Sequence, residues 1–574
     1  MRTSMKLLAG FLIWAAIAPA QAQDIAPEAA TGRSHKTSVT AQTYMIAAAN
    51  PLAAQAGYNV LHDGGNAVDA MVATQMVLGL VEPQSSGLGG GAFLVYHDGT
   101  SEKLTTLDGR ETAPLAATRD MFLKPNGTPM KFFEAVVGGR SVGTPGTLKL
   151  MYEAHQRYGK LSWAQLLQPA ITLANTGFSV SPRLASLIAK DRKRLITYPD
   201  TRRYFFDEHG DPLAAGTTLK NPAYAETLRL IAAHGPDAFY TGEIAQDIVS
   251  AVREASNNPG LLSMADLAAY HVIERAPVCI TYRAHNVCGM GPPSSGALTV
   301  GQTLGMLNHF ELPKPSVQSF HLIAEASRLA FADRGLYMAD SDFVAMPNGL
   351  LDRDYLKGRA TLINTDKAMT DVQPGTPPWK AAEARTLDNA IEFPSTSHMS
   401  IIDGDGNAVS LTTTIENGFG SRVMVRGFLL NNELTDFSFT PEKDGAQVAN
   451  RVEPGKRPRS SMSPTIVYGP DGKLKLVVGS PGGSRIIGYV TQAIIAVLDW
   501  NMDVQDALNL PHVVGRFGTV DVETGADALA QQLQTKGHKV KVRDLNSGLH
   551  AIIRGEKGLI GGADPRREGL VLGQ

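Results

Sequence analysis

Residues 398–414 read HMSIIDGDGNAVSLTTT, two runs in which apolar and polar residues alternate on either side of Asp-Gly turn residues. Alternation with a period of two predicts strands, and a short Asp-Gly connection predicts that the strands pair as an antiparallel hairpin. The pattern recurs as AFLVYHDGTSEKLTTLD at 92–108 and as TIVYGPDGKLKLVVG at 465–479. The sequence therefore predicts three hairpins that contribute to antiparallel sheet.

Helical stretches lie beside these hairpins. Asn50-Pro51 has the N-cap and first-turn arrangement that begins a helix, and Asn66 caps a second helix that is apolar nearly all round. A further helix begins at Ser316, and the segment 140–340 is mostly helical. Helices that flank antiparallel sheets predict an α+β architecture with two sheets stacked between helix layers. Because we find no internal repeat and no long linker, we expect one intertwined unit.

The composition excludes several classes of protein. The chain has 574 residues with 53 basic and 55 acidic side chains, a formal net charge of −2. A nucleic-acid binder needs clustered Lys and Arg for phosphate contacts, so this near balance argues against one. An apolar fraction of 43% also argues against a disordered chain. We expect a globular protein with a large core.

The first 22 residues have the pattern of a secretory signal. Arg2 and Lys6 form a positive start, residues 7–19 are apolar but too few to span a bilayer, and Ala20-Gln21-Ala22 fits the small-x-small cleavage rule. We expect the mature chain to begin after residue 22, in the periplasm if the source is Gram-negative. An uncleaved membrane anchor is the alternative interpretation.

Export places the two cysteines in an oxidising compartment. Cys279 and Cys288 lie in PVCITYRAHNVCGM, which has the pattern of two short strands around a turn. A cross-strand disulfide fits this arrangement, and two buried free thiols are the alternative. Nothing in the pattern indicates a catalytic cysteine.

A glycine-rich turn follows the third hairpin. The strand LKLVVG leads into Ser480-Pro481-Gly482-Gly483-Ser484 and then into the apolar helix RIIGYVTQAIIAVLDW. Glycines at a helix start leave backbone N–H groups free to bind an anion or an oxyanion, although a tight turn without a ligand has the same pattern. We find no G-x-S-x-G elbow and no H-E-x-x-H helix, so neither a serine-hydrolase triad nor a metal site is predicted.

Five C-terminal motifs occur in an order that resembles the γ-glutamyltransferase (γ-glutamyl transpeptidase) family. They are TSHMS (396–400), DGDGNAVS (403–410), LLNNELTDFS (429–438), RPRSSMSPT (457–465) and GSPGGSR (479–485). Upstream stretches such as GLGGGAFLV (87–95) and LDGRETAP (107–114) agree, and the resemblance covers about residues 45–520.

The resemblance implies an N-terminal nucleophile hydrolase, a four-layer αββα sandwich formed jointly by two fragments of one precursor. Members of the family cut themselves before a Thr, and the match puts this cut between Ser395 and Thr396. A large subunit, 23–395, would then pair as a heterodimer with a small catalytic subunit, 396–574. The resemblance implies no metal and no organic cofactor.

The cut has a chemical rationale. A Thr hydroxyl is a weak nucleophile that needs a nearby base, and cleavage frees the Thr396 α-amino group, whose reference pKa of roughly 7.7–8.0 suits that role. The family places a Thr that hydrogen-bonds the nucleophile at the position of Thr414. Gly482 and Gly483 match its oxyanion-hole donors.

A γ-glutamyl donor carries an α-carboxylate and an α-ammonium, and the resemblance supplies partners for both. Arg110, Ser460 and Ser461 match the residues that bind the carboxylate, for which a planar guanidinium offers two parallel hydrogen bonds. Glu433 and Asp436 match the acidic pair that faces the ammonium. Glu416 stands where the family often has Asn, and we keep it as a further substrate contact.

The activity implied is transfer of a γ-glutamyl group from glutathione to water, or to an amino acid or peptide acceptor, through an acyl-Thr396 ester. A glutaryl-type (cephalosporin) acylase of the same fold is one alternative, but its substrate lacks the ammonium that the acidic residues would bind. An unprocessed protein that only binds γ-glutamyl compounds is the other. The segment 437–459 is shorter than in relatives with a full lid loop, which predicts a more open pocket.

Overall fold

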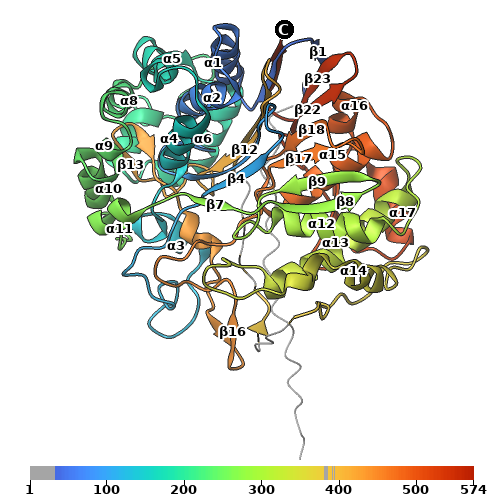
Figure 1. The fold of residues 1–574 in the computed structure, drawn as a ribbon. Coiled ribbons are helices and arrows are strands. Elements are labelled where there is room, and N and C mark those ends of the chain that lie inside the picture. Colours follow the sequence, from blue (N-terminus) through green and yellow to red (C-terminus); the bar gives the residue numbers. More distant parts are fainter. Residues whose placement is uncertain (1–32, 380–384, 389, 391, 393–394) are drawn as a thin grey trace, which may run out of the picture.

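A computed structural model describes residues 33–379, 385–388, 390, 392 and 395–574 (Figure 1). The predicted signal segment, 1–22, lies outside the described residues. Searched over the described ranges, the chain has no helix that is both long and apolar enough to span a membrane. The fold is a mixed α+β fold, as the sequence predicts, and it is built around two seven-stranded sheets.

The first sheet contains the hairpin of residues 398–414, and all its neighbouring strands are antiparallel. Its strands, in spatial order, are β24 (Leu570–Gly573), β2 (Met45–Ala48), β11 (Ser397–Ile402), β12 (Ala408–Thr414), β3 (Gly91–His97), β4 (Leu104–Gly109) and β7 (Ile273–Arg275). The hairpins predicted at 398–414 and 92–108 are therefore adjacent, because β12 pairs with β3.

The second sheet contains the third predicted hairpin, and it is antiparallel throughout. Its strands, in spatial order, are β1 (Val39–Ala41), β23 (Gly558–Ala563), β22 (His550–Gly555), β18 (Leu474–Gly479), β17 (Thr465–Tyr468), β9 (His285–Gly289) and β8 (Val278–Tyr282). Cys279 and Cys288 are directly opposite each other in β8 and β9, and a disulfide joins them. Residues 39–41 form an edge strand of this sheet by pairing with β23.

Helices lie against the outer face of each sheet (Figure 1). On the first sheet these are α1 (Pro51–His62), α2 (Ala67–Val81) and α4 (Thr147–Tyr158), and on the second they are α12 (Gly296–Leu307), α15 (Ile486–Leu498) and α16 (Val504–Asn509). The Asn50 and Asn66 side chains cap α1 and α2 as predicted. Gly57 lets α1 approach α2 closely, because a Cβ there would lie 2.3 Å from the Thr74 hydroxyl.

The remaining helices extend these two layers. Around the first lie α3 (Phe132–Val136), α5 (Trp163–Thr176), α6 (Pro182–Leu195), α7 (Pro199–Phe205), α8 (Pro222–His234), α9 (Asp237–Tyr240), α10 (Glu243–Arg253) and α11 (Met264–Ala269). Around the second lie α13 (Val317–Tyr337), α14 (Arg353–Ala360) and α17 (Asp527–Thr535). Ser316 caps α13 as predicted.

Short strands and 3₁₀ turns complete the structure. The short strands are β5 (Phe178–Ser179), β6 (Thr218–Leu219), β10 (Arg385–Thr386), β13 (Met424–Val425), β14 (Phe428–Leu429), β15 (Glu442–Lys443), β16 (Ala446–Val448), β19 (Val513–Arg516), β20 (Thr519–Glu523) and β21 (Val540–Arg543). The 3₁₀ turns are η1 (Gly139–Ser141), η2 (Asn348–Leu351), η3 (Glu433–Asp436) and η4 (Gly483–Arg485).

The central strands are buried on both faces. In β3, Leu94 and Tyr96 belong to the core shared with α2, whereas Phe93 and Val95 belong to the core shared with the second sheet and α15. Successive side chains of a strand point to opposite faces, so one strand contributes to two cores. This burial explains why the strand sequence is apolar beyond simple alternation.

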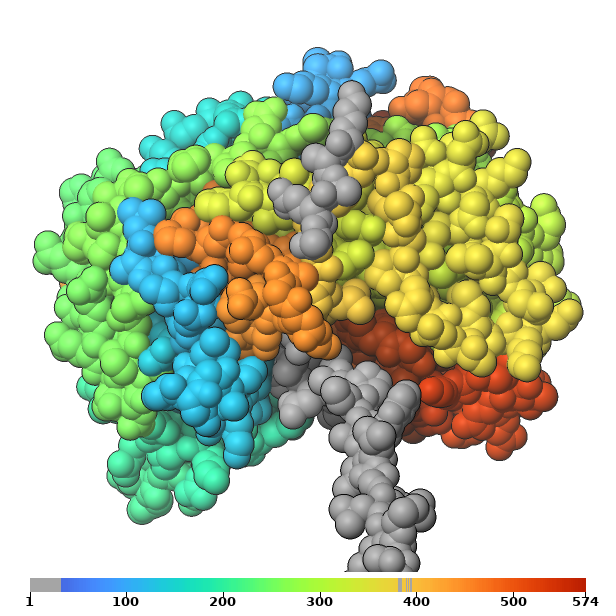
Figure 2. Space-filling view, turned by 90° about the horizontal axis from the view of Figure 1, so that it is seen from below, coloured from blue at the N-terminus to red at the C-terminus, as the bar shows by residue number. Residues whose placement is uncertain are grey.

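A third, smaller core joins two segments that are far apart in the sequence. Phe122 stacks on Phe439 with ring centroids 4.6 Å apart, and Phe437 and Val452 belong to the same cluster. Figure 2 shows this side of the molecule, where the segment around Phe439 (orange) lies beside the segment around Phe122 (blue). Residues 437–452 are therefore anchored to the body of the protein.

Candidate active site

The hairpin of β11 and β12 brings two threonines together. Ser397 pairs with Thr413, so Thr396 and Thr414 face each other at the open end of the hairpin. The Thr396 hydroxyl donates to the Thr414 hydroxyl over 3.5 Å. Thr414 in turn donates its proton to the carbonyl oxygen of Ser395 over 2.9 Å, and accepts from the backbone N–H of Glu416 over 2.8 Å. Thr414 thus contacts both sides of the Ser395–Thr396 peptide bond.

The backbone around this peptide bond is held by partners from distant parts of the chain. Arg567 donates to the Thr396 carbonyl over 3.1 Å, and the Ser395 hydroxyl donates to the Gln84 carbonyl over 2.7 Å. The Ser397 hydroxyl donates to the Glu82 carboxylate over 3.1 Å. All these groups are buried, so the segment has a fixed geometry in the uncut chain.

Glu82 is an unusual acid because it is fully buried. Burial raises its pKa to about 7, against the opposing effect of Arg183 and Arg567. Arg183 lies 3.6 Å from the carboxylate. A carboxyl group that titrates near neutral pH therefore lies one residue away from the Thr396 hydroxyl, through Ser397.

The predicted glycine turn connects β18 to α15 beside the threonine pair. Gly482 has a φ of 138° and Gly483 a φ of 59°, both in the left-handed region that favours glycine. A Cβ on Gly482 would lie 2.7 Å from the Tyr489 ring. Gly483 and Thr396 line the same pocket, so the turn presents backbone to the space in front of the Thr396 hydroxyl.

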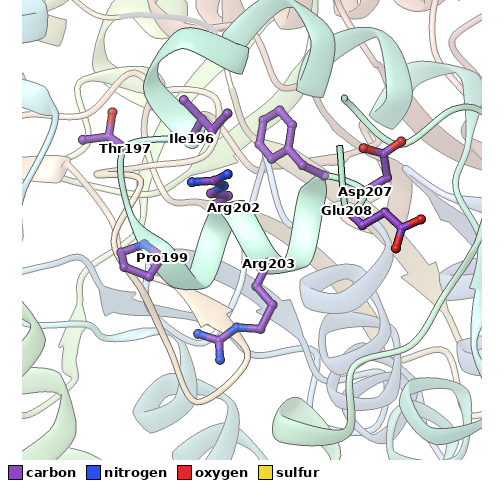
Figure 3. Close-up of a pocket in the computed structure, with 8 residues that line it drawn as sticks. Ile196, Thr197, Pro199, Arg202, Arg203, Asp207 and Glu208 are labelled. Atoms are coloured by element: carbon purple, nitrogen blue, oxygen red, sulfur yellow. The ribbon is translucent and has the colours of Figure 1, made fainter. Parts of the chain in front are cut away.

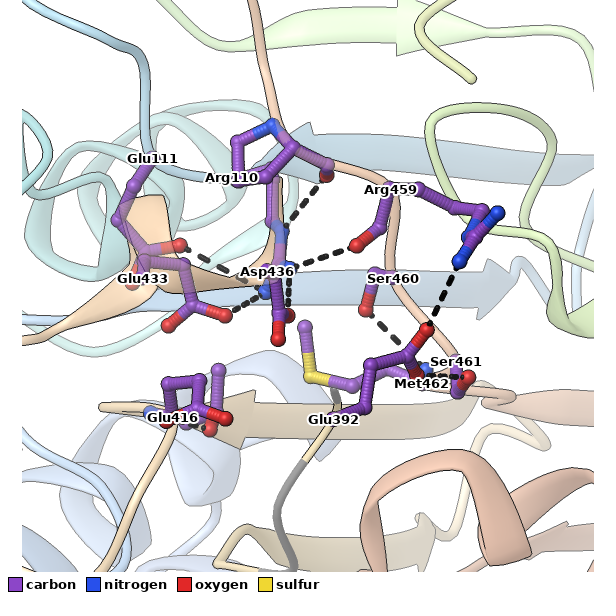
Figure 4. Close-up of polar contacts among 12 residues, drawn as sticks. Arg110, Glu111, Glu392, Glu416, Glu433, Asp436, Arg459, Ser460, Ser461 and Met462 are labelled. Atoms are coloured by element: carbon purple, nitrogen blue, oxygen red, sulfur yellow. Dashed lines mark hydrogen bonds and ion pairs between the residues drawn. The ribbon is translucent and has the colours of Figure 1, made fainter. Parts of the chain in front are cut away.

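Arg110 lines the same pocket and is surrounded by a cluster of carboxylates (Figure 4). The guanidinium forms ion pairs with Glu433 and, over 2.5 Å, with Asp436, and Glu111 lies 3.9 Å away. It also donates to the backbone carbonyls of Pro458 and Arg459. Arg110 follows β4, and η3 supplies both of its ion-pair partners.

The three carboxylates exceed the single guanidinium in charge. Burial raises the pKa of Glu433 and of Asp436 well above the ordinary range, although Arg110 opposes the change, and it raises the pKa of Glu111 to about 7. Within the described part of the chain, Glu433 Oε2 and Asp436 Oδ1 are buried without a hydrogen-bond partner. Such a site can accept hydrogen bonds and positive charge from a ligand.

Glu416 adds a further carboxylate to the pocket lining. It accepts a hydrogen bond from the Asn432 amide and has a φ of 72°. Asn is enriched in this left-handed conformation relative to Glu, which gives a backbone reason for the Asn that the family often has here.

Ser460 and Ser461 also line this pocket. The Ser460 hydroxyl accepts from the Met462 N–H over 3.2 Å. The Ser461 hydroxyl donates to Glu392 and accepts from Arg334 Nη2 over 2.7 Å. The carboxylate of Glu392, which precedes the Ser395–Thr396 bond, therefore lies inside the pocket (Figure 4).

The pocket is nearly full in the uncut chain. Its free volume is about 20 Å³, room for about one water molecule. We expected a more open pocket from the short 437–459 segment, whereas the free volume is small and Glu392 is one of the residues that line it. Across the residues with described positions, no cluster of His, Cys, Asp and Glu could hold a metal ion.

A larger groove of about 550 Å³ lies elsewhere, at α7. Arg202, Arg203, Asp207 and Glu208 are among its lining residues (Figure 3). These charges are exposed to solvent and of both signs, which is typical of a solvated surface. None of the predicted site residues lines this groove, whereas most of them line the small pocket at Thr396.

Comparison with known proteins agrees with this geometry. The sequence profile of the family described as Gamma-glutamyltranspeptidase matches residues 53–574. The chain belongs to this family. It is 39% identical over 547 residues to the "Glutathione hydrolase proenzyme" of Bacillus subtilis (strain 168), covering 92% of this chain and 91% of that protein.

Solved structures of relatives have the same fold. A cephalosporin acylase from Bacillus halodurans superposes with a TM-score of 0.82 at 29% identity, covering 96% of this chain and 99% of that one. The gamma-glutamyltranspeptidase of Helicobacter pylori has a TM-score of 0.55 at 33% identity, and the match covers 60% of this chain and 97% of the Helicobacter pylori chain. The profile of the gamma-glutamyltranspeptidase family thus covers nearly the whole chain.

The structure gathers all the sequence-predicted site residues around one pocket or directly beside it. Sequence reasoning missed five residues that contact these groups, Glu82, Arg334, Glu392, Arg459 and Arg567. Arg459 lies inside the motif RPRSSMSPT, so that motif held a signal for it. No pattern in the sequence marks Glu82, Glu392 or Arg567.

Proposed function

We propose that this protein is an autoprocessing γ-glutamyltransferase and glutathione hydrolase. The observation that carries the proposal is the position of Thr396, whose hydroxyl, the Thr414 hydroxyl and the Ser395 carbonyl form one hydrogen-bonded chain beside a carboxylate-rich pocket. Membership of the family and the name of the Bacillus subtilis relative support the same activity.

The first step would be cleavage of the chain between Ser395 and Thr396. The Thr396 hydroxyl attacks the Ser395 carbonyl, to which Thr414 already donates a hydrogen bond that favours negative charge on the oxygen. An ester forms as the peptide bond breaks, and water hydrolyses it. The products are a large fragment, 23–395 after removal of the signal, and a small fragment, 396–574.

The freed amino group of Thr396 would then serve as the base. It takes the proton of the Thr396 hydroxyl as the oxygen attacks the γ-carbonyl of the donor, and it returns that proton to the departing amine. Backbone N–H groups at Gly482 and Gly483 stabilise the oxyanion. Water or the amine of an amino acid or peptide then releases the γ-glutamyl group from the acyl-enzyme.

The donor would be oriented by opposite charges at its α-carbon. The unpartnered oxygens of Glu433 and Asp436, with Glu416 nearby, suit an α-ammonium. Arg110, Ser460 and Ser461 suit the α-carboxylate. The fragments would stay together as a heterodimer, because each seven-stranded sheet contains strands of both fragments. Helices lie on the outer faces of the sheets, which supports the arrangement of an αββα sandwich.

A cephalosporin-type acylase is the second candidate, favoured by the likeness to the Bacillus halodurans structure. A glutaryl side chain carries no ammonium, so it would leave the buried carboxylates without a partner. A protein that binds γ-glutamyl compounds without cutting itself is a third candidate. We further propose export to the periplasm if the source is Gram-negative, from the residue pattern of 1–22.

Intact-mass measurement on the exported protein tests the cleavage. We expect two fragments that begin after residue 22 and at Thr396, and we expect Thr396→Ala to remain a single inactive chain. Thr396→Ser is the matched control, because it keeps a hydroxyl and should still be cut. A cut Thr396→Ala chain would overturn the assignment of the nucleophile, and an uncut active wild type would favour a different mechanism.

Paired substrates test the specificity. The wild-type enzyme should hydrolyse γ-glutamyl-4-nitroanilide at least about 100-fold faster, in kcat/KM, than glutaryl-4-nitroanilide, because the absent ammonium leaves buried acceptors unpaired. Equal rates, or faster glutaryl hydrolysis, would favour the acylase.

A further inference from the structure

Arg567 brings a buried guanidinium from the C-terminal segment to the Thr396 backbone. Its Nη1 donates to the Thr396 carbonyl oxygen over 3.1 Å, and its Nε donates to the Asn546 side-chain oxygen over 3.2 Å. Gly548 leaves room for this side chain, because a Cβ there would lie 2.8 Å from Arg567 Cδ. Arg567 has no role in the reaction proposed above, although it places a full positive charge beside Thr396.

The segment that carries Arg567 is fixed to the N-terminal part of the described chain. Lys36 Nζ donates to three backbone carbonyls, those of Asp564, Arg567 and Gly569, over 2.8, 2.8 and 2.6 Å. Hydrogen bonds from one ammonium to three carbonyls hold this stretch of backbone in one position. These contacts do not involve the Ser395–Thr396 bond, so cleavage of that bond would leave the guanidinium in place.

The guanidinium also lies close to the Thr396 nitrogen. Within one residue the nitrogen and the carbonyl oxygen are roughly 3 Å apart, so Arg567 Nη1 lies no more than roughly 7 Å from this nitrogen. In the uncut chain the nitrogen belongs to an amide, and cleavage would turn it into an amine that can gain a proton. A positive charge at this distance favours the neutral amine, which is the form that can act as a base.

Other ionisable groups surround Thr396 on two sides. Among the described residues, those that line the pocket are Arg110, Glu392, Glu416, Glu433 and Asp436. Those around Arg567 and the start of β11 are Glu82, Arg183, Glu568, His398 and His550. Burial lowers the pKa of both histidines, so they are neutral at pH 7.

The pocket carboxylates have an effect opposite to that of Arg567. Glu392 forms an ion pair with Arg334, so three carboxylates of the pocket remain opposite the guanidinium of Arg110. Negative charge near an amine favours its protonated form. The pocket by itself therefore disfavours the neutral amine that the reaction needs at Thr396, and Arg567 supplies positive charge that offsets this effect.

Glu82 moderates the effect of Arg567. Its carboxylate accepts from the Ser397 hydroxyl over 3.1 Å, and burial raises its pKa to about 7 while Arg183 and Arg567 oppose the rise. When it is ionised, Glu82 favours the protonated amine at Thr396. We expect this effect to be smaller than that of Arg567, because Glu82 contacts the next residue and not Thr396 itself.

We propose that Arg567 is a positioning residue that holds the Thr396 carbonyl and keeps the freed Thr396 amino group in its neutral, basic form. Ionised Glu82 opposes the second effect. The inference rests on the proposed function, because the amino group exists only after cleavage. Arg567 exchanges no proton, because a guanidinium stays charged throughout the reaction.

The pH dependence of the processed enzyme tests the proposal. The acidic limb of kcat/KM for γ-glutamyl-4-nitroanilide reports the base of the free enzyme. Arg567→Gln should move this limb to higher pH by about 1 pH unit, because the amine then holds its proton more tightly. Arg567→Lys keeps the charge and should leave the limb close to that of the wild type. An unchanged limb in Arg567→Gln, or an equal shift in Arg567→Lys, would overturn the proposal.

Arg202→Gln is the matched control for loss of one positive charge. Arg202 lines the exposed groove at α7 and not the pocket, so solvent and salt screen its charge and the limb should stay in place. A shift in Arg202→Gln as large as that in Arg567→Gln would mean that net charge and not position causes the effect, and would overturn the proposal.

Glu82→Gln provides a second test that holds even where Arg567→Gln does not fold. It should move the acidic limb to lower pH, by about 0.5 pH unit, because a negative charge is removed. A general disturbance of the site would lower kcat without moving the limb in opposite directions in the two variants. No shift in Glu82→Gln, or a shift to higher pH, would overturn the proposal. Failure of the proposed function is separately visible, because the wild-type chain would then stay uncut or turn over no anilide.

Discussion

The Thr414 hydroxyl donates a 2.9 Å hydrogen bond to the carbonyl oxygen of Ser395, the residue that precedes Thr396. It also accepts from the Thr396 hydroxyl over 3.5 Å. One hydroxyl on the last residue of β12 therefore contacts both the attacking oxygen and the carbonyl that it would attack. The pairing of β11 with β12 creates this relationship, because it sets the two ends of the hairpin side by side.

Thr414→Val should slow self-cleavage by about 100-fold or more, because it removes the donor to the Ser395 carbonyl while keeping the β-branched shape. The measurement is the time course of fragment appearance by SDS gel electrophoresis after synthesis at low temperature. Thr414→Ser keeps the hydroxyl and should be cut at a rate close to that of the wild type. Cleavage of Thr414→Val at the wild-type rate would contradict this role.

Gly482→Ala should reduce both activity and stability. The added Cβ would lie 2.7 Å from Tyr489 at a φ of 138°, so we expect a loss of about 2–4 kcal/mol in the free energy of unfolding and a lower kcat from the displaced turn. Gly358→Ala is the control, because its Cβ on α14 meets nothing within 4 Å and should be neutral or stabilising. Equal urea-unfolding midpoints for the two variants would contradict the prediction.

Glu416→Gln should weaken donor binding through the ammonium alone. Removing one of the pocket carboxylates should raise KM for γ-glutamyl-4-nitroanilide about 3- to 10-fold, with a smaller effect on kcat. Steady-state kinetics on the glutaryl analogue give the control, since a substrate without an ammonium should show no rise in KM. A parallel rise for both substrates would mean that Glu416 shapes the pocket and does not bind the ammonium.

Glu82→Gln should remove part of the pH dependence of stability. In the folded state burial raises the pKa of Glu82 to about 7, with Arg183 and Arg567 opposing and Glu568 adding to the rise. The folded protein therefore holds this proton where the unfolded chain, with a pKa of about 4.3, has lost it. The contribution of Glu82 to the free energy of unfolding is fully present at a pH below its pKa in the unfolded chain. This contribution falls by about 3–4 kcal/mol as the pH rises to about 7.

The experiment uses the uncut Thr396→Ala chain, with and without Glu82→Gln, so that one species unfolds. We expect the urea midpoint to fall less between pH 5 and pH 8 when Gln replaces Glu82, because Gln has no proton to lose. The same fall in both proteins would show that Glu82 does not hold its proton in the folded state.

Local patterns in the sequence were sufficient to predict the helices, strands and turns near the candidate site. The three Asp-Gly hairpins, the Asn caps of α1 and α2 and the glycine turn before α15 all occur where the residues predict them. Each depends on neighbours within a few positions, which a sequence pattern records directly. No such local pattern marks β1, because its pairing partner, β23, is more than 500 residues away.

Ordered motifs were sufficient to predict the candidate site residues. The charges that surround these residues could not be predicted from the motifs. Arg110 was predicted to bind the donor's α-carboxylate, and the structure adds that Glu433 and Asp436 pair with it. The small volume of the pocket was unexpected, because the prediction considered the length of segment 437–459 and not Glu392, which also lines the pocket. Both outcomes depend on which side chains share a buried space.

The sequence by itself determined the family and the α+β class and predicted Thr396 as the nucleophile, because these follow from local periodicity and from motifs that resemble a known set. Only the tertiary structure decided that Thr414 contacts the Ser395 carbonyl, that Glu82 lies behind Ser397 and that Arg334 and Arg459 share Glu392. These contacts join residues that are up to 315 positions apart. Their energies depend on distance and burial, which exist only once the two sheets have packed together.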